Sequence, residues 1–187
     1  MEQEVELGNP RTGPLTGVRV ADFSAIFSGP IAGAMLADQG ADVIKVEAFS
    51  GDLMRKGYPQ SGGMASAFTS MNRNKRGLSV DLQTPEGKTI ATKLIQSADV
   101  VLENFRPGVM DRLGLGYEVF KDSHPKLVYA SINGVGSVGP YANRRVYDAV
   151  IQAISGFTAL RVDDKPEMVN SLICDKVTSL TAAEAIV

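Results

Sequence analysis

The alternation of short apolar runs with helix-like segments most constrains what this chain can fold into. Five runs have the composition of strands: Val18–Phe23, Asp42–Glu47, Gly77–Leu82, Asp99–Phe105 and Lys126–Ile132. Strands that alternate with helices form parallel sheets, because each helix returns the chain to the edge where the strands begin. The sequence therefore predicts an α/β fold with a doubly wound, mainly parallel sheet and flanking helices.

Helices are expected between these strands. Gly29 and Pro30 predict a turn, followed by a helix over Ile31–Gln39 that ends at Gly40. Thr84 is suited to cap a second helix, with Pro85 at its first position. The apolar residues of this second helix recur at helical spacing, at Ile90, Ala91, Leu94, Ile95 and Ala98.

A third helix is expected over Val146–Ile154, before Gly156. Its apolar residues form a stripe that is typical of a buried helix face, at Val146, Ala149, Val150, Ala153 and Ile154. The last segment has helical character and stops at Val187 with no capping signal. This abrupt stop predicts that the chain is part of a longer protein.

The composition is that of an ordinary globular domain and excludes few function classes. The chain has 187 residues, 44% of them hydrophobic and 21% charged, with a net charge of -2, so neither a nucleic acid nor a membrane partner is indicated. No apolar run approaches the ~18 residues of a membrane span. The single cysteine excludes an internal disulfide and favours a cytoplasmic location, and the single histidine argues against a metal site or a Ser/His/Asp triad.

Three glycines after the fifth strand have the spacing G-x-G-x-x-G, at Gly134, Gly136 and Gly139. A dinucleotide-binding turn with this spacing opens a helix and is followed about 20 residues later by an acidic residue. Here Pro140 follows at once, and Asp148 lies too close to the first glycine. The glycines are better explained by a tight turn and a close approach of the backbone, and NAD binding is the weaker alternative.

Basic residues gather in or beside the predicted loops. They are Lys75 and Arg76 in the stretch NRNKR, then Arg106, Arg112, Arg144 and Arg145. Such residues form a solvated rim in many proteins, but they also bind phosphate groups through charged hydrogen bonds. The charge pattern alone leaves both interpretations open.

Several stretches together resemble the family III coenzyme A transferases. They include SGPIAGAMLADQGADVIKVE, NRNKRGLSVDLQTPEGK, ADVVLENFRPGVMDRLGLGYE and PKLVYASINGVGSVGPYANRRVYDAVIQAISG. The resemblance implies that residues 1–187 are the N-terminal part of a Rossmann-like, CoA-binding large domain, with a smaller domain and the C-terminal half absent. It also implies an interlocked homodimer that acts on an acyl-CoA and a carboxylic acid acceptor.

The resemblance also assigns CoA contacts by their place in the motifs. These are Asn104, Arg112, Arg145, the basic residues Lys75 and Arg76, and the backbone of Leu78–Gln83, including Leu78 and Val80, which lies beside the adenine in the family. Two positions depart from the family pattern. Phe27 stands where relatives often have a polar residue, and Ala48 where they often have a basic one. We therefore expect differences in the acyl pocket and in part of the nucleotide contact.

The resemblance assigns the chemistry to Asp175, in the stretch SLICDKVTSL. In the family, an aspartate at this place attacks the thioester carbonyl, forms an acyl–aspartyl mixed anhydride and releases CoA as a thiolate. Local sequence alone favours another role for Asp175, because an aspartate before a helix is a preferred N-cap.

Two other functions remain open. The first is an α-methylacyl-CoA racemase, but racemases of this family pair the aspartate with a histidine where this chain has Tyr147. The second is a non-catalytic CoA-binding or nucleotide-binding module.

Overall fold

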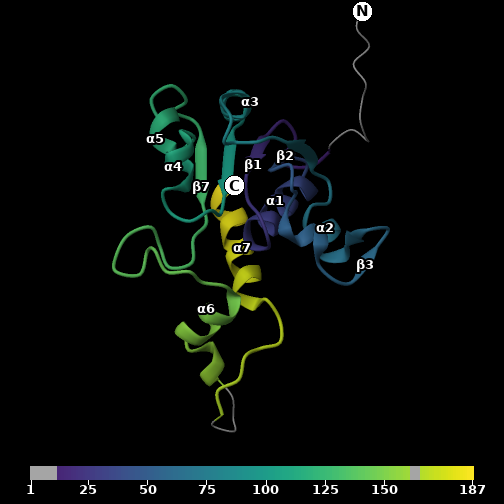
Figure 1. Cartoon of the computed structure of the whole chain (residues 1–187), viewed down its shortest axis with the longest axis vertical. Helices are drawn as coiled ribbons and strands as arrows, with labels where there is room; N and C mark the ends of the chain where they lie inside the picture. Colours follow the sequence, from purple (N-terminus) through teal and green to yellow (C-terminus); the bar gives the residue numbers. More distant parts are fainter. Residues whose placement is uncertain (1–11, 161–164) are drawn as a thin grey trace, which may run out of the picture.

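A five-stranded parallel sheet forms the centre of the computed structural model, which describes residues 12–160 and 165–187 (Figure 1). Its strands are β1 (Arg19–Asp22), β2 (Asp42–Glu47), β5 (Arg76–Ser79), β6 (Val100–Glu103) and β7 (Val128–Ser131), in the order β5-β2-β1-β6-β7. All neighbouring strands are parallel. The α/β fold and the five strands are confirmed, although each strand except β2 is shorter than the apolar run that predicted it.

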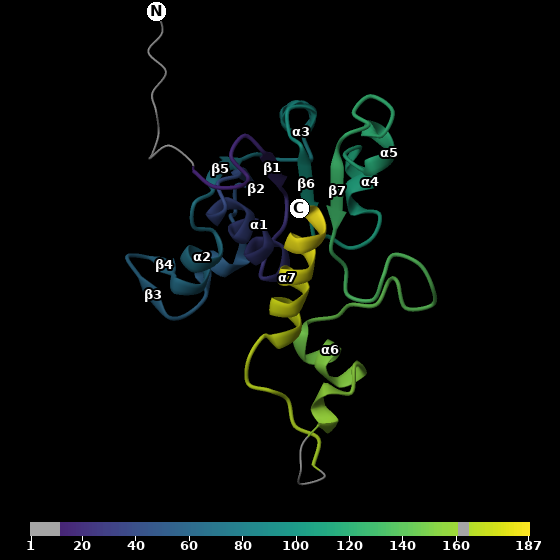
Figure 2. The same cartoon turned by 180° about the vertical axis from the view of Figure 1, so that it is seen from behind.

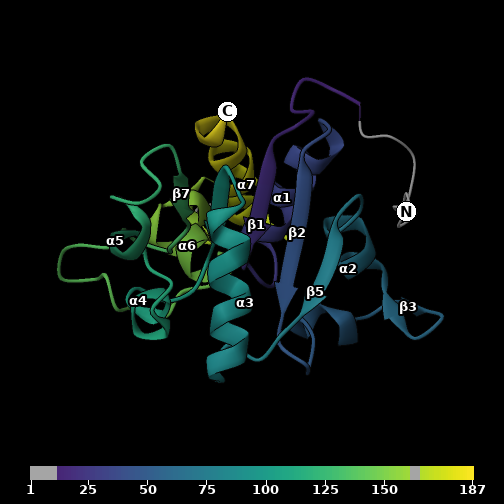
Figure 3. The same ribbon diagram turned by 90° about the horizontal axis from the view of Figure 1, so that it is seen from above.

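Helices cover both faces of this sheet (Figure 3). One face packs against α3 (Pro85–Gln96), α4 (Val109–Leu113) and α5 (Tyr117–Phe120). The other face packs against α1 (Ser28–Asp38) and α7 (Ile173–Ile186). No helix in the described part of the chain is long and apolar enough to cross a membrane.

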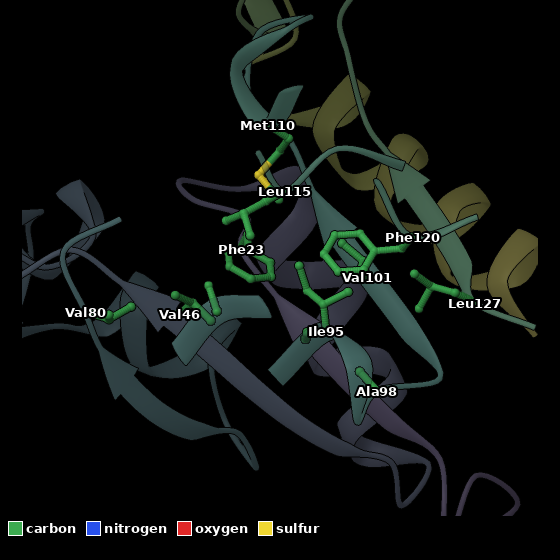
Figure 4. Packing of buried hydrophobic residues seen from close by; sticks show 12 residues of the cluster. Phe23, Val46, Val80, Ile95, Ala98, Val101, Met110, Leu115, Phe120 and Leu127 are labelled. Carbon is green, nitrogen blue, oxygen red and sulfur yellow. The ribbon is translucent and has the colours of Figure 1, made fainter. Parts of the chain in front are cut away.

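The two buried clusters follow from the alternation of side chains along each strand. Ala21, Phe23 and Val101 pack with Ile95 of α3 on one face (Figure 4). Their neighbours Val20 and Leu102 pack toward α1 and α7 on the other face. Because the central strands are covered on both sides, they read as nearly unbroken apolar runs.

The order in which strands are added to the sheet reverses at β1. The chain moves outward through β2 and β5, returns to β6 beside β1, and then continues to β7. The loops after β1 and β6 therefore leave neighbouring strands in opposite directions, and ligands of open α/β sheets bind where this happens. A ligand site is therefore expected at the loops after Asp22 and Glu103.

The first helix begins earlier than expected. Gly29 and Pro30, which predict a turn, lie in the first turn of α1, which starts at Ser28. Proline is tolerated there because the first N–H groups of a helix have no partner within the helix. An added Cβ at Gly29 would lie 2.2 Å from Ser24 Cβ, so this glycine allows the helix to start close to the preceding loop.

A small excursion between β2 and β5 was not expected. It comprises η1 (Leu53–Lys56), the hairpin of β3 (Gln60–Ser61) and β4 (Met64–Ala65), and α2 (Ser66–Met71). The hairpin turns at Gly62 and Gly63, which have positive φ values of 59° and 78°. Two glycines between short strands are a recognised hairpin signal, and the sequence contained it.

The helix α6 (Asp148–Ile154) lies beyond the N-terminal end of α7, and η2 (Phe157–Ala159) follows it (Figures 1 and 2). The expected burial of its apolar stripe is wrong: Val150 is 41% exposed and Ile154 60% exposed. The buried residues of α6 are instead Asp148 and Gln152. The reason is that α6 contacts α7 and η2 rather than the sheet.

Candidate active site

Side chains from distant segments hold the loop between β1 and α1. The Asn104 side chain, just after β6, accepts a hydrogen bond from the Ala25 N–H and donates one to the Ala25 carbonyl, both at 2.8 Å. The Ile26 N–H donates to Asp52 Oδ2 at 3.2 Å. Ile26 has a φ of 72°, which is rare for a β-branched residue and is maintained by these contacts.

Two buried ion pairs support this loop from the side of the sheet that faces α1. Lys75 Nζ lies 2.8 Å from Asp22 Oδ2, and Lys45 Nζ lies 3.0 Å from Asp52 Oδ2. Lys45 also donates to the Ser24 carbonyl at 2.9 Å. Charged side chains are rarely buried unless they are paired, and these pairs fix the course of the chain into α1.

Asp175 is the third residue of α7, in its first turn. Leu172 occupies the N-cap position, and its side chain makes no capping hydrogen bond. The alternative that Asp175 is the N-cap is therefore wrong. The cap comes from another helix, because the Asp175 N–H donates to Asp148 Oδ1 at 2.9 Å.

The Asp175 carboxyl group is partly buried between the first turns of α7 and α1. Burial raises its pKa, and the nearby charge of Asp148 raises it further, while a hydrogen bond with Ser28 acts in the opposite direction. The two helices are joined here, because Ser179 Oγ donates to the Ser28 carbonyl at 2.8 Å. A carboxylate at a helix N-terminus also interacts favourably with the helix dipole.

Two of the predicted CoA contacts have structural partners within the chain. The Lys75 ammonium donates to Asp22 Oδ2, to the Pro30 carbonyl and to Asn72 Oδ1, which uses its three N–H bonds. Arg76 begins β5 and pairs with Asp42 at 2.6 Å. Since Arg76 and Asp42 begin their strands, this pair lies at the amino edge of the sheet, opposite the edge where Asn104 lies.

The remaining predicted contacts are more accessible or belong to the core. The Arg112 and Arg145 side chains are exposed, and neither makes a hydrogen bond or ion pair with the residues that the structure describes. Leu78 packs against the core and Val80 is buried in it. The structure brings Asn104 to the β1–α1 loop, whereas Arg112 lies on α4 and Arg145 in the loop before α6.

The two positions that depart from the family pattern lie near the same edge. Phe27 is the N-cap residue of α1 and is partly buried, directly before Ser28. Ala48 follows β2 and is exposed. Both therefore lie at the ends of strands or helices that border the candidate site.

The three glycines after β7 are explained by turns and a close approach. Gly136 and Gly139 have φ values of 86° and 97°, which favour glycine. An added Cβ at Gly134 would lie 1.7 Å from Val146 Cγ2, so the loop passes too close for a side chain. No helix begins at these glycines, because α6 starts only at Asp148, and the helix that a dinucleotide fingerprint requires is missing there.

From the sequence, no individual role was predicted for five residues that shape the site: Ser28, Lys45, Asp52, Asp148 and Gln152. For two of them, Asp148 and Gln152, the sequence contains a pattern that places them together. They are four residues apart, so they share the polar face of α6. A polar face is normally solvated, and the sequence contained nothing to indicate its burial.

Comparison with known proteins identifies the family. The sequence profile of CoA-transferase family III matches residues 15–187. The chain belongs to this family. Succinate–glutarate CoA-transferase of Agrobacterium fabrum is 40% identical over 186 residues, covering 94% of this chain and 46% of the relative. Formyl-CoA:oxalate CoA-transferase of Bradyrhizobium diazoefficiens is 42% identical over 181 residues, covering 94% of this chain and 42% of the relative.

A solved structure of the family has the same fold. A CAIB/BAIF family protein from Brucella suis superposes with a TM-score of 0.89 at 40% identity, covering 94% of this chain and 48% of that protein. The chain therefore spans less than half the length of each of these three proteins.

Proposed function

We propose that the complete protein is an acyl-CoA:carboxylate CoA-transferase in which Asp175 is the nucleophile. The observation that best supports this is the placement of Asp175: a partly buried carboxyl group in the first turn of α7, beside Ser28 at the start of α1. The CoA-transferases that this chain resembles support the reaction class.

In the proposed reaction, a carboxylate oxygen of Asp175 attacks the thioester carbonyl of the donor. The C–S bond breaks, CoA leaves as a thiolate, and an acyl–aspartyl anhydride forms. The thiolate then attacks the aspartyl carbonyl and releases the donor acid. The acceptor carboxylate attacks the resulting aspartyl thioester, and the thiolate finally attacks the acceptor carbonyl of the second anhydride. This last step regenerates Asp175 and gives the new acyl-CoA.

The surroundings of Asp175 suit a nucleophile of this kind. Its raised pKa means that the carboxylate is more basic than an exposed one, and a more basic carboxylate is a better nucleophile. The N-terminal end of α7 favours negative charge, so the helix stabilises the ionised form of the carboxylate that attacks the thioester.

CoA binding and assembly are part of the same proposal. Asn104, Arg112 and Arg145 are proposed to contact CoA, with the two exposed guanidinium groups available for phosphate oxygens. The proposal also includes the remaining part of the large domain, a smaller domain and an interlocked homodimer. The cytoplasm is the proposed location, since a single cysteine suits a reducing compartment.

Isotope transfer tests the proposed route directly. The complete protein is incubated with an acyl-CoA and an acceptor acid labelled with ¹⁸O in its carboxylate. The final thiolate attack leaves one acceptor oxygen on Asp175, so mass spectrometry of the peptide that contains Asp175 is expected to show added ¹⁸O. No label at Asp175 during active CoA transfer contradicts the proposal.

A parallel incubation of the complete protein with a branched acyl-CoA in deuterated water distinguishes the racemase alternative. A racemase exchanges the α-proton of a branched acyl-CoA with deuterium from solvent, and it leaves Asp175 unlabelled. CoA binding with neither label nor exchange points to a non-catalytic module.

The raised pKa of Asp175 predicts the pH dependence of the reaction. The carboxylate must be ionised to attack, so kcat/KM is expected to fall with decreasing pH through a pKa above the usual aspartate value of 3.8. Asp148→Asn removes the neighbouring negative charge and is expected to lower the pKa of Asp175. The acid limb of the pH–rate profile should then move to lower pH, and a shift to higher pH contradicts the assignment.

A further inference from the structure

Gln152 is a long polar side chain in an unexpected place. It is only 2% exposed, although Val150 and Ile154 on the same helix are open to solvent. Burying an amide is unfavourable unless its donors and acceptor are all satisfied. The burial of Gln152 in preference to its apolar neighbours therefore requires an explanation in its hydrogen bonds.

Both ends of the Gln152 amide are used. Oε1 accepts a hydrogen bond from the Val169 N–H at 2.9 Å. Nε2 lies 2.6 Å from Asp148 Oδ2, 3.1 Å from the Ser171 carbonyl and 3.3 Å from the Val169 carbonyl. These contacts hold residues 169–171, which lead into α7, against α6. The shortest contact of Nε2 is the one to Asp148.

Asp148 continues this connection to Asp175. One oxygen of its carboxylate is held by Gln152, and the other accepts the Asp175 N–H at 2.9 Å. The first turn of α7 has no cap of its own, so Asp148 supplies the acceptor that the turn needs. A rotation of the Asp148 carboxylate would break this contact with the Asp175 N–H and also the 2.6 Å contact with Gln152 Nε2.

We propose that Gln152 is a positioning residue for Asp175, an inference that rests on the proposed CoA-transfer function. Gln152 fixes the Asp148 carboxylate and the 169–171 segment, and together these fix the backbone from which the Asp175 side chain projects. Gln152 touches no reacting atom in this scheme. Its effect reaches the reaction through the orientation of the nucleophile, to which rates are sensitive.

Gln152→Met in the complete protein tests this inference, because methionine has a similar volume and no hydrogen bonds to offer. The value of kcat, normalised to the folded fraction, is expected to fall about tenfold or more. The KM for acyl-CoA is expected to stay within about twofold, because the proposed CoA contacts lie on other elements. Gln96→Met, at the exposed end of α3, is the matched control and should change neither constant. A normal kcat for Gln152→Met overturns the inference.

Gln152→Glu tests positioning through the pH dependence of kcat, which would not change if Gln152 served only to stabilise the fold. Protonated glutamic acid can donate to Asp148 Oδ2 and accept from the Val169 N–H, whereas ionised glutamate can only accept and repels Asp148. The variant is therefore expected to lose kcat as the pH rises and its new carboxyl group ionises, which adds an alkaline limb to the acid limb that Asp175 sets. Among the residues that the structure describes, the titratable groups on the elements around Gln152 are Tyr147 and Asp148 at the start of α6, Lys165 and Glu167 before α7, and Cys174, Asp175, Lys176 and Glu184 on α7.

The unsubstituted protein contains the same titratable groups. The alkaline limb is therefore assigned to position 152 only if the pH profile of the unsubstituted protein lacks it. If Gln152→Met does not fold, the full pH profile of Gln152→Glu decides the question. A Gln152→Glu variant whose pH profile matches that of the unsubstituted protein overturns the inference.

Hydrogen exchange separates a failure of this inference from a failure of the proposed function. The Asp175 amide is expected to exchange at least tenfold faster in Gln152→Met, as measured at residue resolution by fragmentation mass spectrometry. This result does not depend on any activity. If the unsubstituted protein transfers no CoA, the proposed function fails while the exchange rate still tests the positioning. An unchanged exchange rate overturns the inference.

Discussion

Asp175→Asn is expected to abolish CoA transfer and to leave acyl-CoA binding within a few-fold of the unsubstituted protein. Asparagine has nearly the same shape and keeps the backbone N–H that Asp148 accepts, but its amide oxygen is a poor nucleophile. Removal of a nucleophile costs on the order of 10⁴-fold or more in kcat. The measurements are steady-state kcat and the burst of free CoA in the first turnover, which should vanish.

The control for this substitution is Asp122→Asn. Asp122 is an exposed aspartate in the turn after α5, and its replacement should leave kcat unchanged. Residual activity of more than about one per cent in Asp175→Asn would assign the nucleophile to another residue, because it greatly exceeds what loss of a nucleophile allows.

The sheet could be predicted because its signal is local. Val100, Val101 and Leu102 are all buried, so β6 appears in the sequence as an unbroken apolar run. The turn to α3 is equally local, since the Thr84 hydroxyl accepts from the Gly87 N–H at 3.0 Å as a capping residue does. With strands and helices in alternation, the parallel arrangement follows from the geometry of the connections.

The burial of α6 could not be predicted in the same way. An apolar stripe indicates that a helix is amphipathic, but it does not say which neighbour covers which face. Asp148 and Gln152 are buried because the segment 169–171 and the start of α7 supply partners for their polar atoms. Those partners are up to 27 positions away in the chain, beyond the reach of periodicity.

The candidate site could be predicted from the sequence only in part, for the same reason. Lys75 lies in a basic stretch that resembles a phosphate-binding loop, yet its partner Asp22 is 53 residues away. Asp175 has the local appearance of a helix cap, and only resemblance to a family pointed to catalysis. Its proximity to Ser28 and Asp148 depends on how α7 packs against α1 and α6.

Lys75→Met is expected to be the most destabilising single substitution at the edge of the site. The Lys75 and Asp22 side chains are 1% and 0% exposed, so the substitution leaves a buried carboxylate whose remaining donors, among the described residues, are the N–H and hydroxyl of Ser24. Breaking a buried ion pair from one side costs about 3–5 kcal/mol of the free energy of unfolding. The urea midpoint of the complete protein, with the m-value checked for change, measures this loss.

A matched pair of variants distinguishes the buried charge from a general effect of losing a lysine. Lys121→Met removes an exposed ion pair with Glu118 and should leave the urea midpoint nearly unchanged. Adding Asp22→Asn to Lys75→Met removes the unpaired charge and keeps an oxygen for the Ser24 N–H. Because an uncompensated buried charge is the main source of the loss, the double variant should be more stable than Lys75→Met alone. If it is less stable, the loss comes from the contacts of Lys75 with Pro30 and Asn72, and Lys75 acts as a hydrogen-bond donor that anchors α1 rather than as a counter-charge for Asp22.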